Sequence, residues 1–233
     1  MSNEAKAEQL CDQGGQFMMA DNRTEGVKCF AQAIKLGSTR AIVNLGYCFE
    51  NGLGVELDLS KSYEWYRKAA DLGSPFGQRN VGICYEHGRG VAKDPREAVI
   101  WYTKAAEQGN GEAQNNLGNC YDKGIGVGAD IVQAVQWYKK SAESGFPWGM
   151  CNLASCYASG DGIERKPELA FEWYMRAAEM GYPLGQYSVG ACYAHGIGVE
   201  ADISEAKFWW EKAAAQGNED AIYNLNALRS KIK

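Results

Sequence analysis

Cysteine and histidine side chains are the first candidates for chemistry in this sequence, because they serve as nucleophiles, general bases and metal ligands. The 233 residues include eight cysteines and two histidines. Cys84 with His87, and Cys192 with His195, have the i, i+3 spacing that can bring side chains together on a helix. A catalytic pair also needs a third group that orients the base. The helical pattern described below places these cysteines on a buried face and the histidines on an open one, so we expect no Cys–His catalyst.

The histidines are also poor candidates for a metal site. His87 and His195 occupy the same position in units of 36 residues and lie three units apart. Stacked helices lie about 8–10 Å apart, so three units separate the two imidazoles by roughly 30 Å. No CxxC pair or second histidine with ligand spacing accompanies either one. We therefore expect no metal.

Paired glycines recur along the chain and resemble part of a phosphate-binding loop. They lack the preceding strand and the third glycine of the dinucleotide-binding motif. A glycine that follows the last apolar position of a helix can adopt a positive φ and end that helix. No G-x-S-x-G nucleophile motif occurs either. We expect helix termination, and no cofactor, at Gly52/Gly54, Gly88/Gly90, Gly124/Gly126, Gly160/Gly162 and Gly196/Gly198.

These glycines belong to a repeat of 36 residues without insertions, which begins with LGYCFENGLGVELD at Leu45. A fixed period over five copies predicts a solenoid, in which each unit buries its apolar face against its neighbours. We therefore expect an all-α solenoid of helix-turn-helix repeats. An aromatic pair follows the same period and is expected in the core: Trp65–Tyr66, Trp101–Tyr102, Trp137–Tyr138, Trp173–Tyr174 and Trp209–Trp210.

Each unit contains two predicted helices. In the first unit, Ala41, Leu45 and Cys48 belong to an apolar stripe with helical spacing, which predicts a helix over residues 38–51. An aspartate can cap the start of the second helix by accepting from its exposed N–H groups. Unit four has Lys166-Pro167-Glu168 instead, which predicts a weaker start. The capping residues are Asp58, Asp94, Asp130 and Asp202.

The cysteines have the spacing of buried apolar residues. Five of them share one repeat position, and equivalent positions in stacked repeats lie roughly 10 Å apart. A disulfide needs Cα atoms within about 7 Å, so we expect all eight cysteines to be thiols, which suits a reducing compartment. The five are Cys48, Cys84, Cys120, Cys156 and Cys192.

Composition and charge exclude several classes of partner. The net charge is −5 and no block of basic residues occurs, so we expect no nucleic acid. No run of 18 apolar residues exists, so we expect no membrane insertion. No signal peptide is visible at the N-terminus, so we expect a cytoplasmic protein, with removal of an export signal as the alternative.

The repeat units resemble a known family. The segments AIVNLGYCFENGLGVELDLSKSYEWYRKAA and AQNNLGNCYDKGIGVGADIVQAVQWYKKSA look like Sel-1-like repeats, relatives of the tetratricopeptide repeat. The resemblance covers about residues 37–233 and implies a right-handed α/α superhelical solenoid that acts as an adaptor for protein complexes. A cysteine-rich secreted branch of the family carries paired cysteines, where this chain has alanines such as Ala41 and Ala69.

The chain divides into three predicted segments. Residues 1–36 form an N-terminal helical hairpin that resembles a tetratricopeptide repeat, with the shorter connection Ala20-Asp21-Asn22-Arg23. Residues 37–216 form five Sel-1-like repeats, and residues 217–233 form a C-terminal capping helix. Atypical terminal units cover the open ends of a solenoid.

Binding residues are predicted on the side of each first helix that faces away from the packed stripe. Large or charged side chains there, where the framework does not require them, are typical anchors for a partner in the concave groove. The alternative is packing between helices or simple drift. The predicted partner-binding residues are Arg40, Tyr47, Phe76, Arg79, His87, Asn115, Asn119, Trp148, Tyr187 and Tyr223.

Asparagines form a further series at one repeat position. In tetratricopeptide domains the matching asparagine often holds the backbone of a bound peptide, and an amide has the donor and acceptor that this needs. Alternatively, each amide bonds the backbone of the adjacent repeat, because buried amides nearly always have protein partners. Both interpretations stay open for Asn44, Asn80, Asn116 and Asn152.

Together these patterns predict a non-catalytic scaffold or adaptor. We expect a monomer that binds a protein or peptide segment in its groove. The first alternative, taken from the resemblance, is a bacterial host-interaction or toxin-neutralising protein of the immunity type. The second is a hydrolase that binds small molecules, for which the sequence offers no nucleophile with a base.

Overall fold

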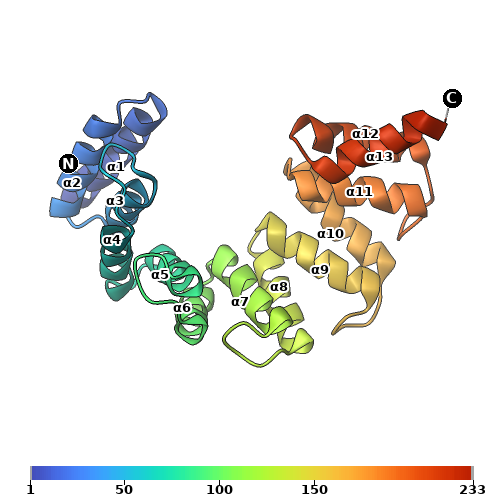
Figure 1. Ribbon diagram of the computed structural model, residues 1–233, viewed down its shortest axis with the longest axis horizontal. Coiled ribbons are helices and arrows are strands. Elements are labelled where there is room, and N and C mark those ends of the chain that lie inside the picture. Colours follow the sequence, from blue (N-terminus) through green and yellow to red (C-terminus); the bar gives the residue numbers. More distant parts are fainter. Residues whose placement is uncertain (1, 232–233) are drawn as a thin grey trace. The chain divides into compact units, whose positions relative to one another are not determined.

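The computed structural model describes residues 2–231, and these residues form α-helices joined by turns and short loops. Consecutive helices pack side by side as pairs (Figure 1). This confirms the predicted all-α array of helix pairs. The helices are Asn3–Met19 (α1), Arg23–Lys35 (α2), Thr39–Asn51 (α3), Leu59–Asp71 (α4), Pro75–His87 (α5), Pro95–Glu107 (α6), Gly111–Lys123 (α7), Ile131–Glu143 (α8), Pro147–Ser159 (α9), Pro167–Glu179 (α10), Pro183–His195 (α11), Ile203–Ala215 (α12) and Glu219–Lys231 (α13).

The chain divides into two compact units. Unit 1 comprises residues 1–110 with the short segment 125–127, and it contains α1 to α6. Unit 2 comprises residues 111–124 and 128–233, and it contains α7 to α13.

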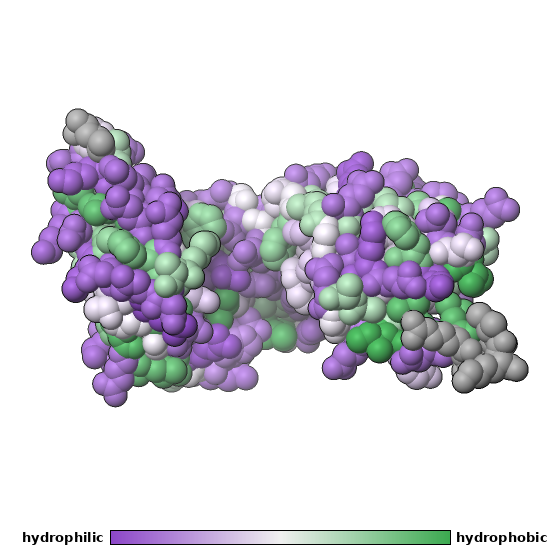
Figure 2. Space-filling view, turned by 90° about the horizontal axis from the view of Figure 1, so that it is seen from above, coloured by the Kyte–Doolittle hydropathy of each residue, from purple (hydrophilic) through white to green (hydrophobic). Residues whose placement is uncertain are grey.

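On the face that Figure 2 shows, hydrophobic surface occurs in separate patches among hydrophilic residues.

Aspartate caps start the second helix of most repeats, as predicted. The side chain of Asp58 accepts from the backbone N–H of Lys61 at 2.9 Å, and Asp94 accepts from the first turn of α6 in the same way. Lys166 precedes α10 without a side-chain capping bond. The predicted absence of an aspartate cap is therefore seen in the structure, since the lysine side chain has no acceptor, and a weaker start of α10 stays a prediction.

The glycine pairs have two different roles, which Gly88 and Gly90 illustrate. Gly88 has φ +72° and its N–H donates to the carbonyl of Cys84, so it ends α5 in the left-handed conformation, as predicted. Gly90 has φ +70°, and a Cβ atom there would overlap the carbonyl oxygen of Leu59 at the start of α4. The second glycine thus lets one repeat lie directly against the backbone of the preceding one.

A glycine–aromatic contact joins the two helices within a repeat. The Tyr66 ring lies so close to Gly46 that a Cβ atom there would be 2.7 Å from its Cδ1 atom. Tyr66 is buried, so this contact belongs to the core, as predicted for the second aromatic of each pair. Equivalent contacts join Gly82 to Tyr102, Gly118 to Tyr138 and Gly190 to Trp210.

The first aromatic residue of each pair is less buried than the core position that the sequence predicts. Trp101 is buried, whereas its equivalents in the other repeats are less buried. A cationic side chain three residues later lies over each ring, for example Lys104 Nζ at 3.9 Å from the Trp101 ring centroid. Residues at i and i+3 are neighbours on a helix surface, so the exposed part of each indole is covered by a cation from its own helix.

All eight cysteines are thiols in the structure, and seven of them are buried. Burial raises the pKa of Cys48 to about 11 and that of Cys84 to about 12. The predicted core role of this cysteine series is therefore confirmed. Among the described residues, no group of three or more histidine, cysteine, aspartate or glutamate side chains is placed to hold a metal ion.

The helices of the described chain are short relative to a lipid bilayer. None of them is both long and apolar enough to cross a membrane.

Candidate functional site

Two neighbouring cavities lie between α3 and α5 in unit 1. The apolar cavity has a volume of about 460 Å³ and is lined by Thr39, Arg40, Val43, Asn44, Ser74, Pro75 and Phe76. The polar cavity has a volume of about 320 Å³ and is lined by Tyr47, Glu50, Asn51, Tyr66, Arg79, Asn80, Ile83, Cys84 and Arg89. Asn44 and Tyr47 are about one turn apart on α3, as are Phe76 and Arg79 on α5. We call the two cavities together the α3–α5 groove.

An exposed aromatic residue, Phe76, lines the apolar cavity. Phe76 is the second residue of α5, directly after Pro75, and 60% of its surface is exposed. Pro75 fits the first helical position, where no N–H bond is lost and φ is already helical. The start of α5 therefore exposes a large apolar ring that is not part of the buried core.

Arg40 also lines the apolar cavity, but its charge is neutralised within unit 1. Its guanidinium donates to Glu8 at 2.9 Å and to Asp12 at 2.7 Å, both on α1. These bonds to two carboxylates raise the pKa of Arg40. Arg40 therefore lines the cavity, but its two ion pairs with α1 neutralise its charge there.

The polar cavity contains a network around Glu50. One oxygen of Glu50 accepts from the hydroxyl of Tyr66 at 2.7 Å, and the other accepts from Nη1 of Arg89 at 2.8 Å. Burial, followed by the bond to Glu50, raises the pKa of Tyr66. Tyr66 therefore remains a protonated donor, and Arg89 compensates the Glu50 charge.

Both arginines of the polar cavity depart from the repeat pattern. The residues at the position of Arg79 in the other four units are Val43, Asn115, Cys151 and Tyr187. Those at the position of Arg89 are Leu53, Ile125, Asp161 and Ile197. One repeat thus carries both arginines, and the fold brings them to one cavity.

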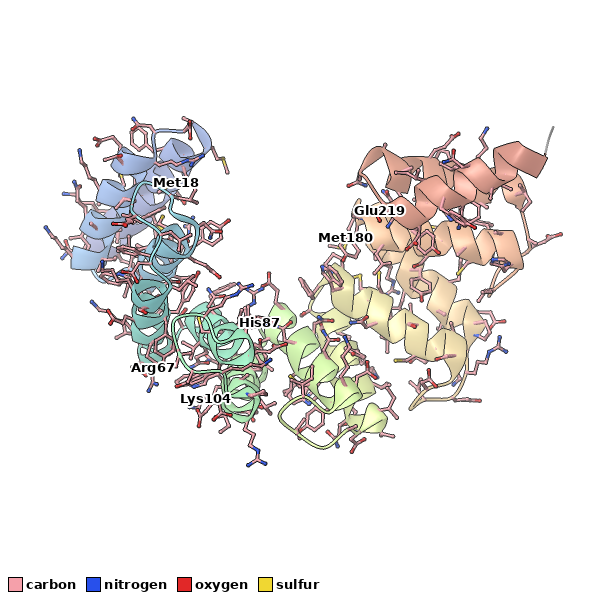
Figure 3. The ribbon with its side chains drawn as sticks, in the orientation of Figure 1. Met18, Arg67, His87, Lys104, Met180 and Glu219 are labelled. Atoms are coloured by element: carbon pink, nitrogen blue, oxygen red, sulfur yellow. The ribbon has the colours of Figure 1, made fainter. Side chains whose placement is uncertain are left out.

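Most of the predicted binding residues of unit 1 gather in the α3–α5 groove. Arg40, Asn44 and Phe76 line its apolar cavity, and Tyr47, Arg79 and Asn80 line its polar cavity. His87 does not line either cavity. It is exposed at the end of α5, where Figure 3 labels it, with Nε2 4.0 Å from a carboxylate oxygen of Glu86.

Two predicted binding residues of unit 2 have a packing role instead. Asn115 is only 5% exposed, and its Oδ1 accepts from Nδ2 of Asn152 at 2.8 Å. Asn119 is half-buried, and its Oδ1 accepts from the hydroxyl of Tyr138 at 2.8 Å. Both amide oxygens therefore accept hydrogen bonds from neighbouring helices, and contact of these two residues with a partner stays a prediction.

The aromatic candidates of unit 2 lie on three different helices. Trp148 on α9 is half-exposed, and its ring packs on Tyr182 with centroids 5.4 Å apart. Tyr187 on α11 is half-buried against the cluster that contains Trp210 and Leu225. Tyr223 on α13 is exposed. Their surroundings differ, and a shared site for these three stays a prediction.

Three of the four predicted asparagines form hydrogen bonds with other side chains. Nδ2 of Asn44 donates to the sulfur of Cys11 at 3.4 Å, and Oδ1 of Asn80 accepts from Nη1 of Arg79 at 2.9 Å. Asn152 donates to Asn115, and Asn116 is half-buried. These bonds involve side chains rather than the backbone of the next repeat. Contact between these amides and a bound peptide stays a prediction.

Pro75 and Arg89 are among the lining residues of the groove that sequence reasoning missed. Arg89 stands between two glycines of a loop, where a leucine or isoleucine occupies three of the other four copies. That departure from the repeat was a usable signal. Its proximity to Glu50 was not visible, because the two residues are 39 positions apart and belong to different repeats.

The helix pairs, the constant period and the open groove together define a helical repeat protein. The Sel1 repeat model matches residues 8–38, 39–74, 75–110, 111–146, 149–182 and 183–218. The chain therefore belongs to the Sel1 repeat family. The match includes residues 8–38, so the first helix pair also falls within the family.

Solved structures show the same relationship. A Sel1 repeat protein from Oxalobacter formigenes is 32% identical, with a TM-score of 0.86, over 94% of this chain and 89% of that one. A protective antigen of uropathogenic Escherichia coli with this fold, c5321, is 35% identical with a TM-score of 0.79. The match covers 95% of this chain but 48% of the antigen, so this chain spans about half the length of that relative.

More distant structures share only the fold. The immunity protein Pa5087 from Pseudomonas aeruginosa is 20% identical with a TM-score of 0.60, over 87% of this chain and 81% of that one. Among curated proteins, none matches this chain significantly.

Proposed function

We propose that this chain is a non-catalytic protein-interaction module, and that the α3–α5 groove binds a segment of its partner. The observation that carries the proposal is the combination of an exposed Phe76 with two arginines outside the repeat pattern, all in one groove. Exposed aromatic and arginine side chains are the residues that most often dominate binding energy at protein interfaces.

The chemistry of the groove supports binding rather than catalysis. Burial raises the pKa of Cys84, the cysteine that lines the groove, to about 12, so its thiol stays protonated at pH 7. The hydroxyl group of Tyr66, which also lines the groove, donates to Glu50, and burial and this bond raise its pKa. Neither group is an activated nucleophile. The buried thiols also favour a reducing compartment, and we propose a cytoplasmic location on that basis.

Peptide display tests the proposal, because it requires no identified partner. A library of random 12-residue peptides is selected on the immobilised wild-type protein. Enriched peptides are then titrated against Tyr47→Ala/Phe76→Ala, which removes an aromatic side chain from each cavity. The matched control is Leu72→Ala/Ile100→Ala, which removes two exposed apolar side chains outside the groove in the same unit.

We expect enriched peptides to lose affinity tenfold or more on the groove variant, since each anchor contributes on the order of 1–2 kcal/mol. The control variant retains wild-type affinity. Equal binding to both variants, or the absence of any enriched peptide, contradicts the proposed function.

A further inference from the structure

We propose that unit 2 has a docking surface of its own, at the N-terminal ends of α9, α11 and α13. It binds a partner segment in which a large apolar residue lies close to a lysine or arginine. The surface is distinct from the α3–α5 groove, which belongs to unit 1. Its apolar part, which we call the α9–α11 strip, consists of Trp148, Met180, Tyr182 and Leu184, and its acidic part consists of Glu219 and Asp220.

The exposure of the strip is the first argument. Trp148 is 50% exposed, although its ring packs on Tyr182 with centroids 5.4 Å apart. Met180, which follows α10 and is labelled in Figure 3, is 56% exposed. Tyr182 and Leu184 rest on a core cluster of unit 2. The strip is therefore an apolar surface with support from the core, and exposed apolar residues that gather in this way mark interaction sites.

The loss of two helix caps is the second argument. Ser74 caps α5 by accepting from the backbone N–H of Gly77 at 3.3 Å, although Pro75 follows it. At the same repeat position α9 and α11 have Phe146 and Tyr182, and neither helix has a side-chain capping bond. A lost cap costs stability, so these aromatic residues need another reason to be there. The other four equivalent positions hold Ser38, Ser74, Asn110 and Asn218.

The charge beside the strip indicates the chemistry of the ligand. Glu219 and Asp220 are exposed, and within the described chain neither carboxylate has an ion pair or a hydrogen-bond partner. They are not needed as caps, because Asn218 already accepts from the first turn of α13 at 2.9 Å. The first turns of α9, α11 and α13 contain no lysine, arginine or histidine. A cation on the partner therefore meets negative charge without competition from a basic side chain of these turns.

Tyr223 adds an aromatic ring to the acidic part. It is 74% exposed and follows Asp220 by three residues on α13. Side chains at i and i+3 are neighbours on a helix surface. A carboxylate beside an exposed ring binds a lysine or arginine through a charged hydrogen bond and a cation–π contact together. The start of α13 therefore favours a basic side chain.

The repeat period sets the spacing of the ligand groups. Trp148, Leu184 and Asp220 occupy one position in consecutive repeats. Equivalent positions in stacked repeats lie roughly 10 Å apart, and an extended peptide advances about 3.3 Å per residue. We therefore expect the basic residue of the ligand about three positions from an apolar residue on Leu184. It should be about six positions from an apolar residue on Trp148.

Peptide display on a groove variant tests the inference. A library of random 12-residue peptides is selected on Tyr47→Ala/Phe76→Ala, so that peptides which need the α3–α5 groove are not enriched. Enriched peptides are synthesised with a fluorescein label and titrated by fluorescence anisotropy. We expect them to share a large apolar residue and a lysine or arginine at one of the two spacings above.

The apolar contact is tested with Trp148→Ala in the groove variant. The matched control is Phe208→Ala, which removes another half-exposed aromatic side chain of unit 2, whose ring packs on Trp209 with centroids 5.5 Å apart. We expect Trp148→Ala to weaken binding tenfold or more, because an aromatic anchor is lost, and Phe208→Ala to weaken it less than twofold. Equal losses contradict binding at the strip.

A double-mutant cycle tests the charge contact. The peptide change is arginine to citrulline, or lysine to acetyl-lysine, which removes the charge and keeps the shape. The protein change is Glu219→Gln/Asp220→Asn, and the control is Glu172→Gln/Glu200→Gln, two exposed carboxylates elsewhere in unit 2. We expect the peptide change to weaken binding at least fivefold, but less than twofold on Glu219→Gln/Asp220→Asn. The full loss should remain on the control, and independent, multiplicative losses contradict contact between the cation and these carboxylates.

Three further outcomes overturn the inference in distinguishable ways. If no peptide is enriched on the groove variant, unit 2 has no such surface, and the proposed function is still decided by selection on the wild-type protein. Peptides that depend on Trp148 but share no basic position refute the cationic ligand. Self-association in sedimentation velocity that Trp148→Ala abolishes assigns the strip to a second copy of this chain. The peptide change remains decisive even where a carboxylate variant unfolds, because it needs only the parent protein.

Discussion

Replacement of Gly90 by alanine should destabilise unit 1 far more than replacement of Gly88, two residues earlier in the same loop. Both glycines have a positive φ, +72° at Gly88 and +70° at Gly90. A Cβ atom at Gly88 would lie 3.3 Å from Cβ of Lys93, a contact that a shift of a few tenths of an ångström relieves. A Cβ atom at Gly90 would overlap the backbone carbonyl of Leu59, which begins α4.

The magnitude follows from two terms. An L-residue in the left-handed conformation costs roughly 1–2 kcal/mol. The lower entropy of the unfolded alanine chain offsets about 0.4–1 kcal/mol of this cost, so Gly88→Ala should lose about 1 kcal/mol. Overpacking adds roughly 1–3 kcal/mol, so Gly90→Ala should lose about 2–4 kcal/mol in total. Gly73→Ala, with φ +85° and no atom within 4 Å, serves as a second control for backbone strain alone.

The assay is urea unfolding at 25 °C, followed by far-ultraviolet circular dichroism. The urea concentration at the midpoint of unfolding should be highest for the wild type and lowest for Gly90→Ala. Gly73→Ala and Gly88→Ala should have similar midpoints between these two. For a chain of this size, each 1 kcal/mol corresponds to about 2–4 °C in Tm, which gives an independent measure. Equal losses for Gly88→Ala and Gly90→Ala would refute the argument that close backbone contact between repeats stabilises the array.

Three further predictions concern caps and thiols. Lys166→Asp should stabilise the chain by about 0.5–1 kcal/mol, because it supplies the missing cap of α10, and thermal unfolding measures the gain. The backbone N–H of Lys61, followed by its ammonium group, lowers the pKa of Asp58 in the folded state. The stability from this cap is therefore present above the unfolded pKa near 4 and is lost as the pH falls through the folded value, and Asp58→Asn should remove this part of the acid dependence of unfolding. In the native protein, a thiol reagent at pH 8 should modify the half-buried Cys29 before the seven buried cysteines, and eight thiols should react in denaturant without reductant.

The repeat frame was predictable because each of its features is local and occurs several times. The stripe of Ala41, Leu45 and Cys48, the cap at Asp58 and the helix end at Gly52 are all visible within one repeat. Five copies of the same pattern then remove the ambiguity that a single copy would leave. The helix predicted over residues 38–51 accordingly differs by one residue from the observed α3.

The candidate site was less predictable because it depends on which variable residues meet. The sequence placed Phe76 and Arg79 away from the packed stripe of α5, and both line the α3–α5 groove. It placed Asn115 on that face as well, but this buried amide accepts a bond from the half-buried Asn152. Contacts between variable side chains of different repeats have no periodic signal, so the structure was needed to find them.

Cross-linking from position 76 tests the central claim most directly. A photoreactive benzoylphenylalanine replaces Phe76 in one protein and the exposed Ile100, outside the groove, in another. A biotinylated peptide enriched by display is added at its Kd, with and without an excess of unlabelled peptide. Binding in the α3–α5 groove predicts a cross-link from position 76 that unlabelled peptide abolishes, and none from position 100. Equal cross-linking from both positions, or none from position 76 while the peptide is bound, would contradict the claim.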